Sequence, residues 1–372
     1  PLFIWMGEIL FRTRLSEEMF KGLSPWLTWL PGRLLHVNVL ASGIFGSVSG
    51  SSAATCATIA KVSLPELRHR GYGDSMILGS LAGAGTLGMI IPPSIVMVVY
   101  AVAADVSIIK IFLAGFLPGL LLMVLFSGYL VVWGLLNPDA VPREGQTPTF
   151  WQKVCASRQL IPVMLLIALI VIVLVLGYAT ATEAAAFGVL GSLLLSLGNQ
   201  SLSWKNFRES LMGTMQLSCM IMFIFAGAAF LTNAMAFTGI PRSLSLWVAQ
   251  LGLSPYSLIA ALTLLYLLLG CVLDGVSMIL LTTAIVVPMV EAAGFDLVWF
   301  GVFIVILIEI AQITPPVGFN LFVLQSMSGR DSLYVARAAI PFFFLMLIAV
   351  GIMTAFPQIV TWLPNTVVSA PR

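Results

Sequence analysis

Charged residues are scarce in this sequence: 17 of the 372 residues are basic and 15 are acidic, a share of 9%. A soluble domain carries roughly 25% charged residues, and it could not bury the 60% of hydrophobic residues found here. The composition therefore indicates a polytopic membrane protein. Its apolar stretches are long runs rather than the short alternating strands of a membrane β-barrel, so an all-α fold is predicted.

Cysteine and histidine are also rare, with four and two residues. The cysteines lie far apart without a CxxC pair, so neither a disulfide framework nor a zinc site is predicted. Neither histidine has a partner at helical spacing, which leaves no catalytic residue to propose and argues against an intramembrane enzyme. The formal charge of +2 is too small and too scattered for a nucleic-acid-binding protein.

Long apolar segments predict the membrane-spanning helices. Two such segments contain a Pro-Pro pair, at Pro92-Pro93 within residues 75–104 and at Pro315-Pro316 within residues 298–324. A Pro-Pro pair removes two backbone donors and prevents a straight helix, so each segment is predicted to be a broken span with a short unwound loop. Four further segments are uninterrupted and near the ~20 residues that a span needs: 109–135, 160–178, 183–199 and 211–236.

Each broken span is preceded by an apolar region with a polar, glycine-containing centre. Residues 34–64 are divided by the run 46–52, and residues 257–290 are divided by the run 270–277. The resulting halves fall short of the ~20 residues of a comfortable span. Both regions are therefore predicted to be re-entrant hairpins rather than spanning helices.

The two hairpin and broken-helix regions align at one constant offset of 223 residues, without a gap. Proline and glycine residues that set backbone geometry coincide, which predicts an internal repeat. We divide the chain into a first repeat (1–136), a connecting loop with scaffold helices (137–210) and a second repeat (211–372). The matched pairs are Pro65 and Pro288, Gly71 and Gly294, Pro92-Pro93 and Pro315-Pro316, and Pro118 and Pro341.

Charge predicts that the two repeats point in opposite directions. The loop at 66–74 carries Arg68 and Arg70, whereas the equivalent loop at 289–297 carries two acidic residues and no basic one. By the positive-inside rule the first loop is cytoplasmic and the second is not, so the repeat is predicted to be inverted. Short helices at the membrane surface are expected before each hairpin, at residues 14–33 and around residues 244–251, although ordinary loops are an equal alternative for 14–33.

Polar residues at the breaks are the candidates for binding. Hairpin tips and unwound loops of an inverted repeat meet near the bilayer midplane, where backbone carbonyls suit a hard cation and half-helix N-termini suit a carboxylate. The tip 49–52 (Ser-Gly-Ser-Ser) fits this chemistry, although Gly46 and Gly50 could simply allow close helix packing. Asp274 occupies the position equivalent to Ser51; it could neutralise a cation, cap a half-helix, or do both. Glu309 is expected to be a buried structural acid.

A set of motifs in fixed order makes the chain resemble the large membrane subunit of TRAP (tripartite ATP-independent periplasmic) transporters, the DctM-like family. The resemblance covers essentially the whole chain, and the relatives begin about one or two helices earlier, in keeping with a start inside a helix at residues 2–11. The motifs are Gly-Ser-Ser-Ala-Ala-Thr (50–55), Leu-Pro-Glu (64–66), Arg-Gly-Tyr (70–72), Ile-Ile-Pro-Pro-Ser (90–94), Ala-Gly (114–115), Pro-Gly (118–119), Thr-Glu-Ala-Ala (182–185) and Thr-Pro-Pro-Val-Gly (314–318).

The resemblance implies a Na⁺-coupled importer of small carboxylate-bearing solutes in the bacterial inner membrane, working by an elevator motion. It implies two partners, a small four-helix membrane subunit and a periplasmic substrate-binding protein. Many relatives carry Asp where this chain has Thr55. The resemblance implies one Na⁺ site at Ser51, Ser52, Gly88 and Pro92, a second at Asp274, Gly275, Thr314 and Pro315, and substrate contacts at Ser94 and Asn320, to which we add the tip residues Ser49 and Gly50.

Two alternatives stay open at this stage. A stand-alone Na⁺/dicarboxylate symporter of related architecture would need no binding protein, but its usual Ser-Asn-Thr signature is absent from both hairpin tips. A channel is conceivable, although paired occluding hairpins favour alternating access.

Overall fold

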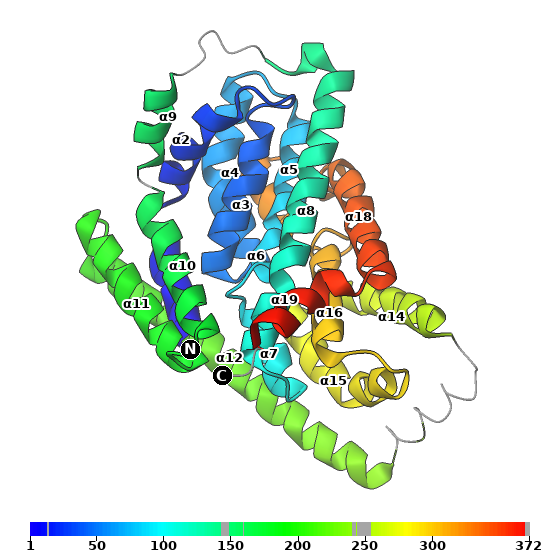
Figure 1. Ribbon diagram of the computed structural model, residues 1–372. Coiled ribbons are helices and arrows are strands. Elements are labelled where there is room, and N and C mark those ends of the chain that lie inside the picture. The colour runs from blue at the N-terminus through cyan, green and yellow to red at the C-terminus, as the bar shows by residue number, and fades with distance from the viewer. Residues whose placement is uncertain (13–14, 143–148, 159, 240–242, 244–253, 369–372) are drawn as a thin grey trace.

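The computed structural model describes residues 1–12, 15–142, 149–158, 160–239, 243 and 254–368 (Figure 1). Within these residues every regular element is a helix and no strand is present, which confirms the all-α class. By length and composition, the described part contains five helices that could cross a membrane: α8 (Ile108–Leu136), α11 (Ala181–Gly198), α12 (Trp204–Thr238), α15 (Gly275–Ala292) and α18 (Ser332–Ala355).

The first predicted hairpin is a pair of packed helices, α3 (Leu35–Ser49) and α4 (Ser52–His69). Gly50 ends α3 with a φ of +59°, a left-handed conformation that glycine adopts without steric cost. Ser51 then caps α4, its hydroxyl accepting a hydrogen bond from the Ala54 amide at 3.4 Å. The tight turn between the helices therefore follows directly from the Gly-Ser pair.

The first Pro-Pro segment is broken as predicted. Helices α5 (Asp74–Gly85) and α6 (Leu87–Ile90) run up to the proline pair, and α7 (Ile95–Ala103) leaves it at an angle of 44°. The structure adds an interruption at Thr86, whose amide bonds to the Gly83 carbonyl three residues back. This additional break was not predicted; it lies in a stretch with three glycines between residues 83 and 88.

The second half repeats this order of elements. Helices α14 (Pro255–Gly270) and α15 (Gly275–Ala292) form the second pair, and α16 (Leu297–Gln312) and α17 (Phe319–Ser328) flank the second proline pair. Helix α15 has the same length as α4 at an offset of 223 residues, and their N-caps keep the same offset. These registers agree with an internal repeat; its opposite orientation and its domain limits stay predictions.

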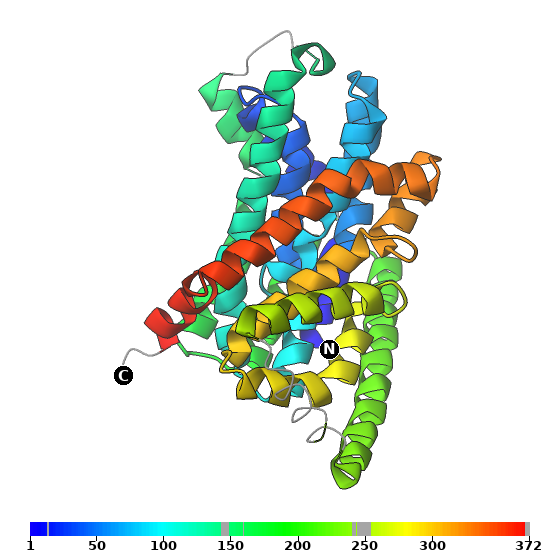
Figure 2. The same cartoon turned by 90° about the vertical axis from the view of Figure 1, so that its right-hand side faces the viewer.

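The remaining helices lie beside these two halves (Figures 1 and 2). Helix α1 (Leu2–Phe11) packs against α11 and α12, while α2 (Leu15–Leu27) packs against α9 (Phe150–Ser157). A hydrogen bond of 2.7 Å from the Trp26 indole to the Ser157 hydroxyl joins α2 to α9. Helix α10 (Ile161–Val175) packs on α11. Helix α8 is followed by the short 3₁₀ turn η1 (Pro138–Ala140). The last helix, α19 (Gln358–Val368), follows α18 and packs against α8.

Helix boundaries differ modestly from the predicted spans. The segment predicted at 211–236 is part of the longer helix α12, and the one predicted at 160–178 is the shorter α10. The surface helix expected at 14–33 corresponds in part to α2, whereas the one expected around residues 244–251 lies outside the described residues. Apolar runs mark the membrane part of a helix, but capping and tertiary contacts decide where the helix ends.

Close packing between α5 and α18 joins the two halves. A Cβ added at Gly79 would lie 2.3 Å from the Ala338 carbonyl oxygen, and one at Gly83 would lie 2.4 Å from the Phe342 ring. Glycines at these two positions, one helical turn apart, allow the backbones to approach closely, as is common between membrane helices. Phe342 also packs edge-to-face on Phe126 of α8.

We expect Gly79→Ala to lower the free energy of unfolding by about 1–3 kcal/mol, because the added methyl group meets backbone that cannot move without separating the helices. Thermal unfolding of the purified protein in detergent measures the effect. Gly128→Ala in α8 is the matched control, since a Cβ there meets nothing within 4 Å. Equal melting temperatures for the two variants would contradict this packing.

Candidate functional site

The tip of the first hairpin is held by a small network of hydroxyl groups. The Ser49 hydroxyl lies 2.7 Å from the Thr55 hydroxyl and donates to the Ser51 carbonyl at 3.3 Å. Ser49 and Thr55 are both buried. The Thr55 hydroxyl therefore acts as a neutral partner of the tip, and three oxygen atoms gather at this point.

Gly88 of α6 lies directly against this tip. A Cβ at Gly88 would be 2.6 Å from the Thr55 hydroxyl and 2.7 Å from the Ser51 carbonyl oxygen, so only glycine fits here. The structure therefore brings together the predicted residues Ser51 and Gly88 and adds Thr55 to them. Hydroxyl and carbonyl oxygens are the ligands that hard cations prefer.

Ser52 links the first hairpin to the second half of the chain. Its hydroxyl accepts a hydrogen bond from the Asn320 side-chain amide at 2.9 Å, and it lies 3.3 Å from the Gly85 carbonyl. The Asn320 amide also lies 3.4 Å from the Ala82 carbonyl. Ser52 and Asn320 are both fully buried. Two residues predicted for different roles, 268 positions apart, thus form one polar cluster with the α5 backbone.

Glu309 of α16 completes this cluster next to the break between α5 and α6. One of its carboxyl oxygens accepts a hydrogen bond from the Met89 amide at 2.8 Å, and the carboxyl lies beside the Ser52 hydroxyl. The side chain is fully buried. The prediction of a buried, hydrogen-bonded acid is therefore confirmed, and its role is to satisfy a backbone donor that the helix break leaves without an intrahelical partner.

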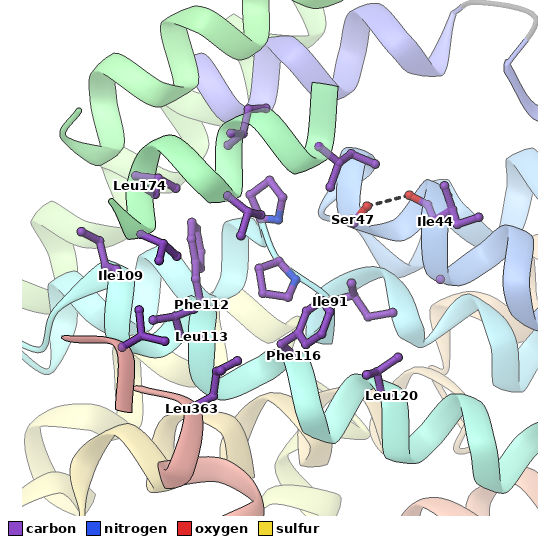
Figure 3. A pocket seen from close by; sticks show the side chains of 18 of the residues that line it. Ile44, Ser47, Ile91, Ile109, Phe112, Leu113, Phe116, Leu120, Leu174 and Leu363 are labelled. Atoms are coloured by element: carbon purple, nitrogen blue, oxygen red, sulfur yellow. Dashed lines mark hydrogen bonds between the residues drawn. The ribbon is translucent and has the colours of Figure 1, made fainter. Parts of the chain in front are cut away.

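The side chains of the first proline pair lie in the wall of an apolar cavity. The cavity measures about 450 Å³ and lies between α3, α8, α10 and α19, with Pro92 and Pro93 in its wall. Figure 3 shows Phe112, Phe116 and Leu363 facing it, and the Ser47 hydroxyl turned away to the Ile44 carbonyl at 2.7 Å. Such a lining suits hydrocarbon and not a carboxylate.

The residues directly after the first proline pair form the start of α7. Ser94 is buried and caps this helix, its hydroxyl 3.5 Å from the Met97 amide. A Cβ at Gly50 would lie 3.1 Å from the Ile95 amide nitrogen, so the hairpin tip touches the N-terminus of α7. The predicted residues Gly50 and Ser94 are therefore neighbours at a helix N-terminus, where an anion is favoured.

The tip of the second hairpin is centred on Asp274. Its carboxylate accepts hydrogen bonds from the amides of Val276 at 3.1 Å and Ser277 at 3.2 Å, and from the Ser277 hydroxyl. The capping role considered for this residue is confirmed. A Cβ at Gly275 would lie 2.5 Å from the Ile308 side chain, so the start of α15 packs tightly on α16.

The remaining predicted residues of the second site are less closely gathered. The Thr314 hydroxyl bonds to the Ile310 carbonyl at 2.7 Å within its own helix turn. The Cys271 thiol lies 3.6 Å from the Pro315 carbonyl, which joins the second tip to the second proline loop. Among the described residues no hydrogen bond links Asp274 to Thr314. Pro315 is exposed, whereas the first proline pair is largely covered.

Sequence reasoning missed several contributors to the site. The carbonyls of Ala82 and Gly85 and the Met89 amide take part through backbone atoms, which no side-chain motif reveals. The glycine-rich run at 83–88 was a signal for exposed backbone, but it is equally typical of close helix packing. The Ser49–Thr55 pair follows from a spacing of six residues across a turn, and neither helical nor strand periodicity predicts it.

Two helix pairs with capped tips, each next to a helix broken at a proline pair, are the architecture expected of a membrane transporter. The chain belongs to the family described as tripartite ATP-independent periplasmic transporter, DctM component, whose model matches residues 1–359. Its relatives are transporter permeases, and it is accordingly a transport subunit rather than an enzyme. The family works with a small membrane subunit and a periplasmic binding protein.

Individual relatives cover almost all of this chain. It is 32% identical to the C4-dicarboxylate TRAP transporter large permease protein DctM of Pseudomonas aeruginosa, over 98% of this chain and 85% of the relative. It is 29% identical to the ectoine/5-hydroxyectoine permease UehC of Ruegeria pomeroyi, over 98% and 84%. It is also 29% identical to the isethionate permease DctMQ of Oleidesulfovibrio alaskensis, over 96% of this chain and 56% of that protein.

We expect Glu309→Leu to destabilise the fold by about 1–3 kcal/mol, because the part-buried Met89 amide loses its acceptor. Glu309→Gln keeps an oxygen at the same position and should melt within a few degrees of the wild type. Thermal unfolding of the two purified variants measures the difference in stability between them and the wild type. If both substitutions destabilise equally, the carboxyl group does more than accept this hydrogen bond.

Proposed function

We propose that this chain is the permease of a Na⁺-coupled transporter that imports small carboxylate-bearing solutes, delivered by a periplasmic binding protein, across the bacterial inner membrane. The observation that supports this most directly is the buried cluster of Ser52 and Asn320. It joins the tip of one hairpin to the broken helix of the other half, which is where a transporter of this architecture binds its ligands.

Sodium coupling is supported by the oxygen atoms at the two tips. In the proposed first site, the Ser51 carbonyl and the Thr55 hydroxyl converge on Gly88, a donor set suited to a hard cation. In the proposed second site, Asp274 supplies a carboxylate that is still partly exposed. The proposed sets are Ser51, Ser52, Gly88 and Pro92 for the first ion, with the Thr55 hydroxyl as a further oxygen, and Asp274, Gly275, Thr314 and Pro315 for the second.

A carboxylate substrate is supported by the helix N-termini that meet at the tips. Helices α4 and α7 begin next to each other at Gly50, and their first amides carry partial positive charge. We propose Ser49, Gly50, Ser94 and Asn320 as the substrate contacts. The name of the Pseudomonas aeruginosa relative refers to C4-dicarboxylates, a class of anion that such a site would accommodate.

The partners and the motion belong to the same proposal. The small subunit is expected to have four helices, and the moving part is expected to consist of the hairpins and broken helices sliding against the remaining helices. The hydrogen bond between Ser52 and Asn320 supports this, because it joins a hairpin of one half to a broken helix of the other.

Uptake into proteoliposomes tests the proposal. With the small subunit present and an inward Na⁺ gradient, labelled organic acids should accumulate only when the neighbouring binding protein is added to the outside. The expected requirement is for both Na⁺ and binding protein. Uptake with Na⁺ alone would place the protein among stand-alone symporters. Uptake without Na⁺ would show that transport is not coupled to this ion.

Substitutions at the tips test the ion sites. Ser52→Ala is expected to raise the Na⁺ concentration for half-maximal uptake about tenfold, the effect of roughly 1.4 kcal/mol of lost binding. Asp274→Asn keeps an N-cap oxygen but removes the charge, and should have a similar effect without unfolding α15.

Ser326→Ala is the control for these substitutions, because Ser326 is an exposed serine on α17 whose one hydrogen bond within the described part of the chain goes to the Val323 carbonyl. Its Na⁺ dependence should equal that of the wild type. Unchanged Na⁺ dependence in folded Ser52→Ala and Asp274→Asn proteins would discard the two proposed sites.

A further inference from the structure

A second cavity lies along α4, away from the hairpin tip. It measures about 1070 Å³ and is bounded by α4 and α17 on one side and by α1, α2 and the start of α12 on the other. It opens near the basic loop at 66–74, which the charge pattern predicts to be cytoplasmic. The helices on its two sides are those proposed above to move and to stay fixed. We refer to this space as the α4 cavity.

Among the charged side chains in the wall of the α4 cavity, basic ones predominate. Arg12, Lys21, Lys61 and Arg70 line it, against one acidic residue, Glu66. Arg70 pairs with Glu66 at 2.8 Å, and Arg12 pairs with Glu8.

Neither Lys21 nor Lys61 forms an ion pair with another described residue. The cavity therefore has positive charge that the described part of the protein does not neutralise, and this charge favours an anion.

A buried hydroxyl in the same wall has no partner. Thr58 lines the α4 cavity and is only 7% exposed, and its hydroxyl has no hydrogen-bond partner among the described residues. A buried polar group without a partner is uncommon, and it indicates a water or a ligand that supplies the bond. Lys61 follows Thr58 by three residues, so the two lie on neighbouring parts of one helix face.

The same face of α4 leads from the hairpin tip to this cavity. Ser51, Thr55 and Thr58 follow one another at spacings of four and three residues, which places them in a row along the helix. Thr58 lies roughly 10 Å from the tip by the rise of an α-helix, and Lys61 about one turn further. A polar row of this kind, inside an otherwise apolar protein, runs along α4 from the proposed substrate site towards the cationic cavity.

We propose that the α4 cavity holds the carboxylate of a small organic anion after it has left the hairpin tip, with the Thr58 hydroxyl donating to it and Lys61 and Lys21 supplying the charge. This rests on the proposed function for the origin of the anion, but the binding site itself does not depend on Na⁺ or on a binding protein. The α4 cavity thus gives the solute a second binding position of low affinity on the cytoplasmic side, from which the solute is released.

Succinate is the probe for a direct binding test. Calorimetric titration of the purified protein with its small subunit, in Na⁺-free buffer, avoids loading the proposed tip sites. Lys61→Gln should weaken succinate binding about tenfold, as expected for the loss of one charge-assisted hydrogen bond, and Thr58→Val should weaken it several-fold. Lys110→Gln removes the same charge at the start of α8, outside the cavity, and should bind as the wild type does.

Accessibility from one side of the membrane gives a second readout. Ala57 lines the α4 cavity and is half-buried. An Ala57→Cys variant, with Cys155, Cys219 and Cys271 replaced by serine, should react with a membrane-impermeant maleimide in inside-out vesicles. Succinate should slow this reaction, and choline chloride at the same ionic strength should not. Cys56 is retained because it is fully buried.

The outcomes separate this inference from the proposed function. Protection by succinate that is lost in Lys61→Gln and kept in Lys110→Gln supports the site, even if the uptake assay finds no carboxylate transport. No succinate binding by the wild type, or equal loss in the two lysine variants, would overturn it. Carboxylate uptake together with an unprotected Ala57→Cys would overturn the α4 cavity site alone and leave the transport proposal intact.

Discussion

The constraint on which this structure depends is that a broken helix inside a membrane must satisfy its backbone groups with protein atoms. The break before the first proline pair shows how this is done. The Met89 amide donates to Glu309, and the Gly85 carbonyl lies within hydrogen-bonding distance of Ser52. Each partner comes from a different element, so one helix break assembles α4, α6, α16 and α17 around a single point.

That assembly has a consequence for ligand binding. The side chains around this break are polar in an otherwise apolar protein. Hydroxyl, amide and carboxyl groups are concentrated where two half-helices begin. The positions Ser51 and Asp274 show the same geometry with different charge: each caps the second helix of its pair, one with a neutral hydroxyl and the other with a carboxylate. A repeated backbone thus carries two chemically different tips, one buried against the core and the other more open.

Much of this arrangement could be predicted from local patterns. Apolar runs located the helices, the proline pairs located the breaks, and the Gly-Ser and Asp-Gly pairs located capped turns, because each depends on residues close together in the chain. The contact of Ser52 with Asn320 could not be predicted, since it joins residues 268 positions apart whose distance no local propensity determines. The break at Thr86 was also missed, because glycine in a helix indicates either packing or interruption.

The sequence by itself determined the class of protein and the positions of the breaks. Few charges and long apolar runs indicate a helical membrane protein. The set of motifs in fixed order indicates one family of transporters. Tertiary structure alone decided which of the polar residues act together. It placed Glu309 against the Met89 amide, set Gly88 against Thr55, and left the Thr58 hydroxyl without a hydrogen-bond partner among the described residues. The reason is physical: hydrogen bonding and burial depend on distances between helices, and these arise only when the helices pack.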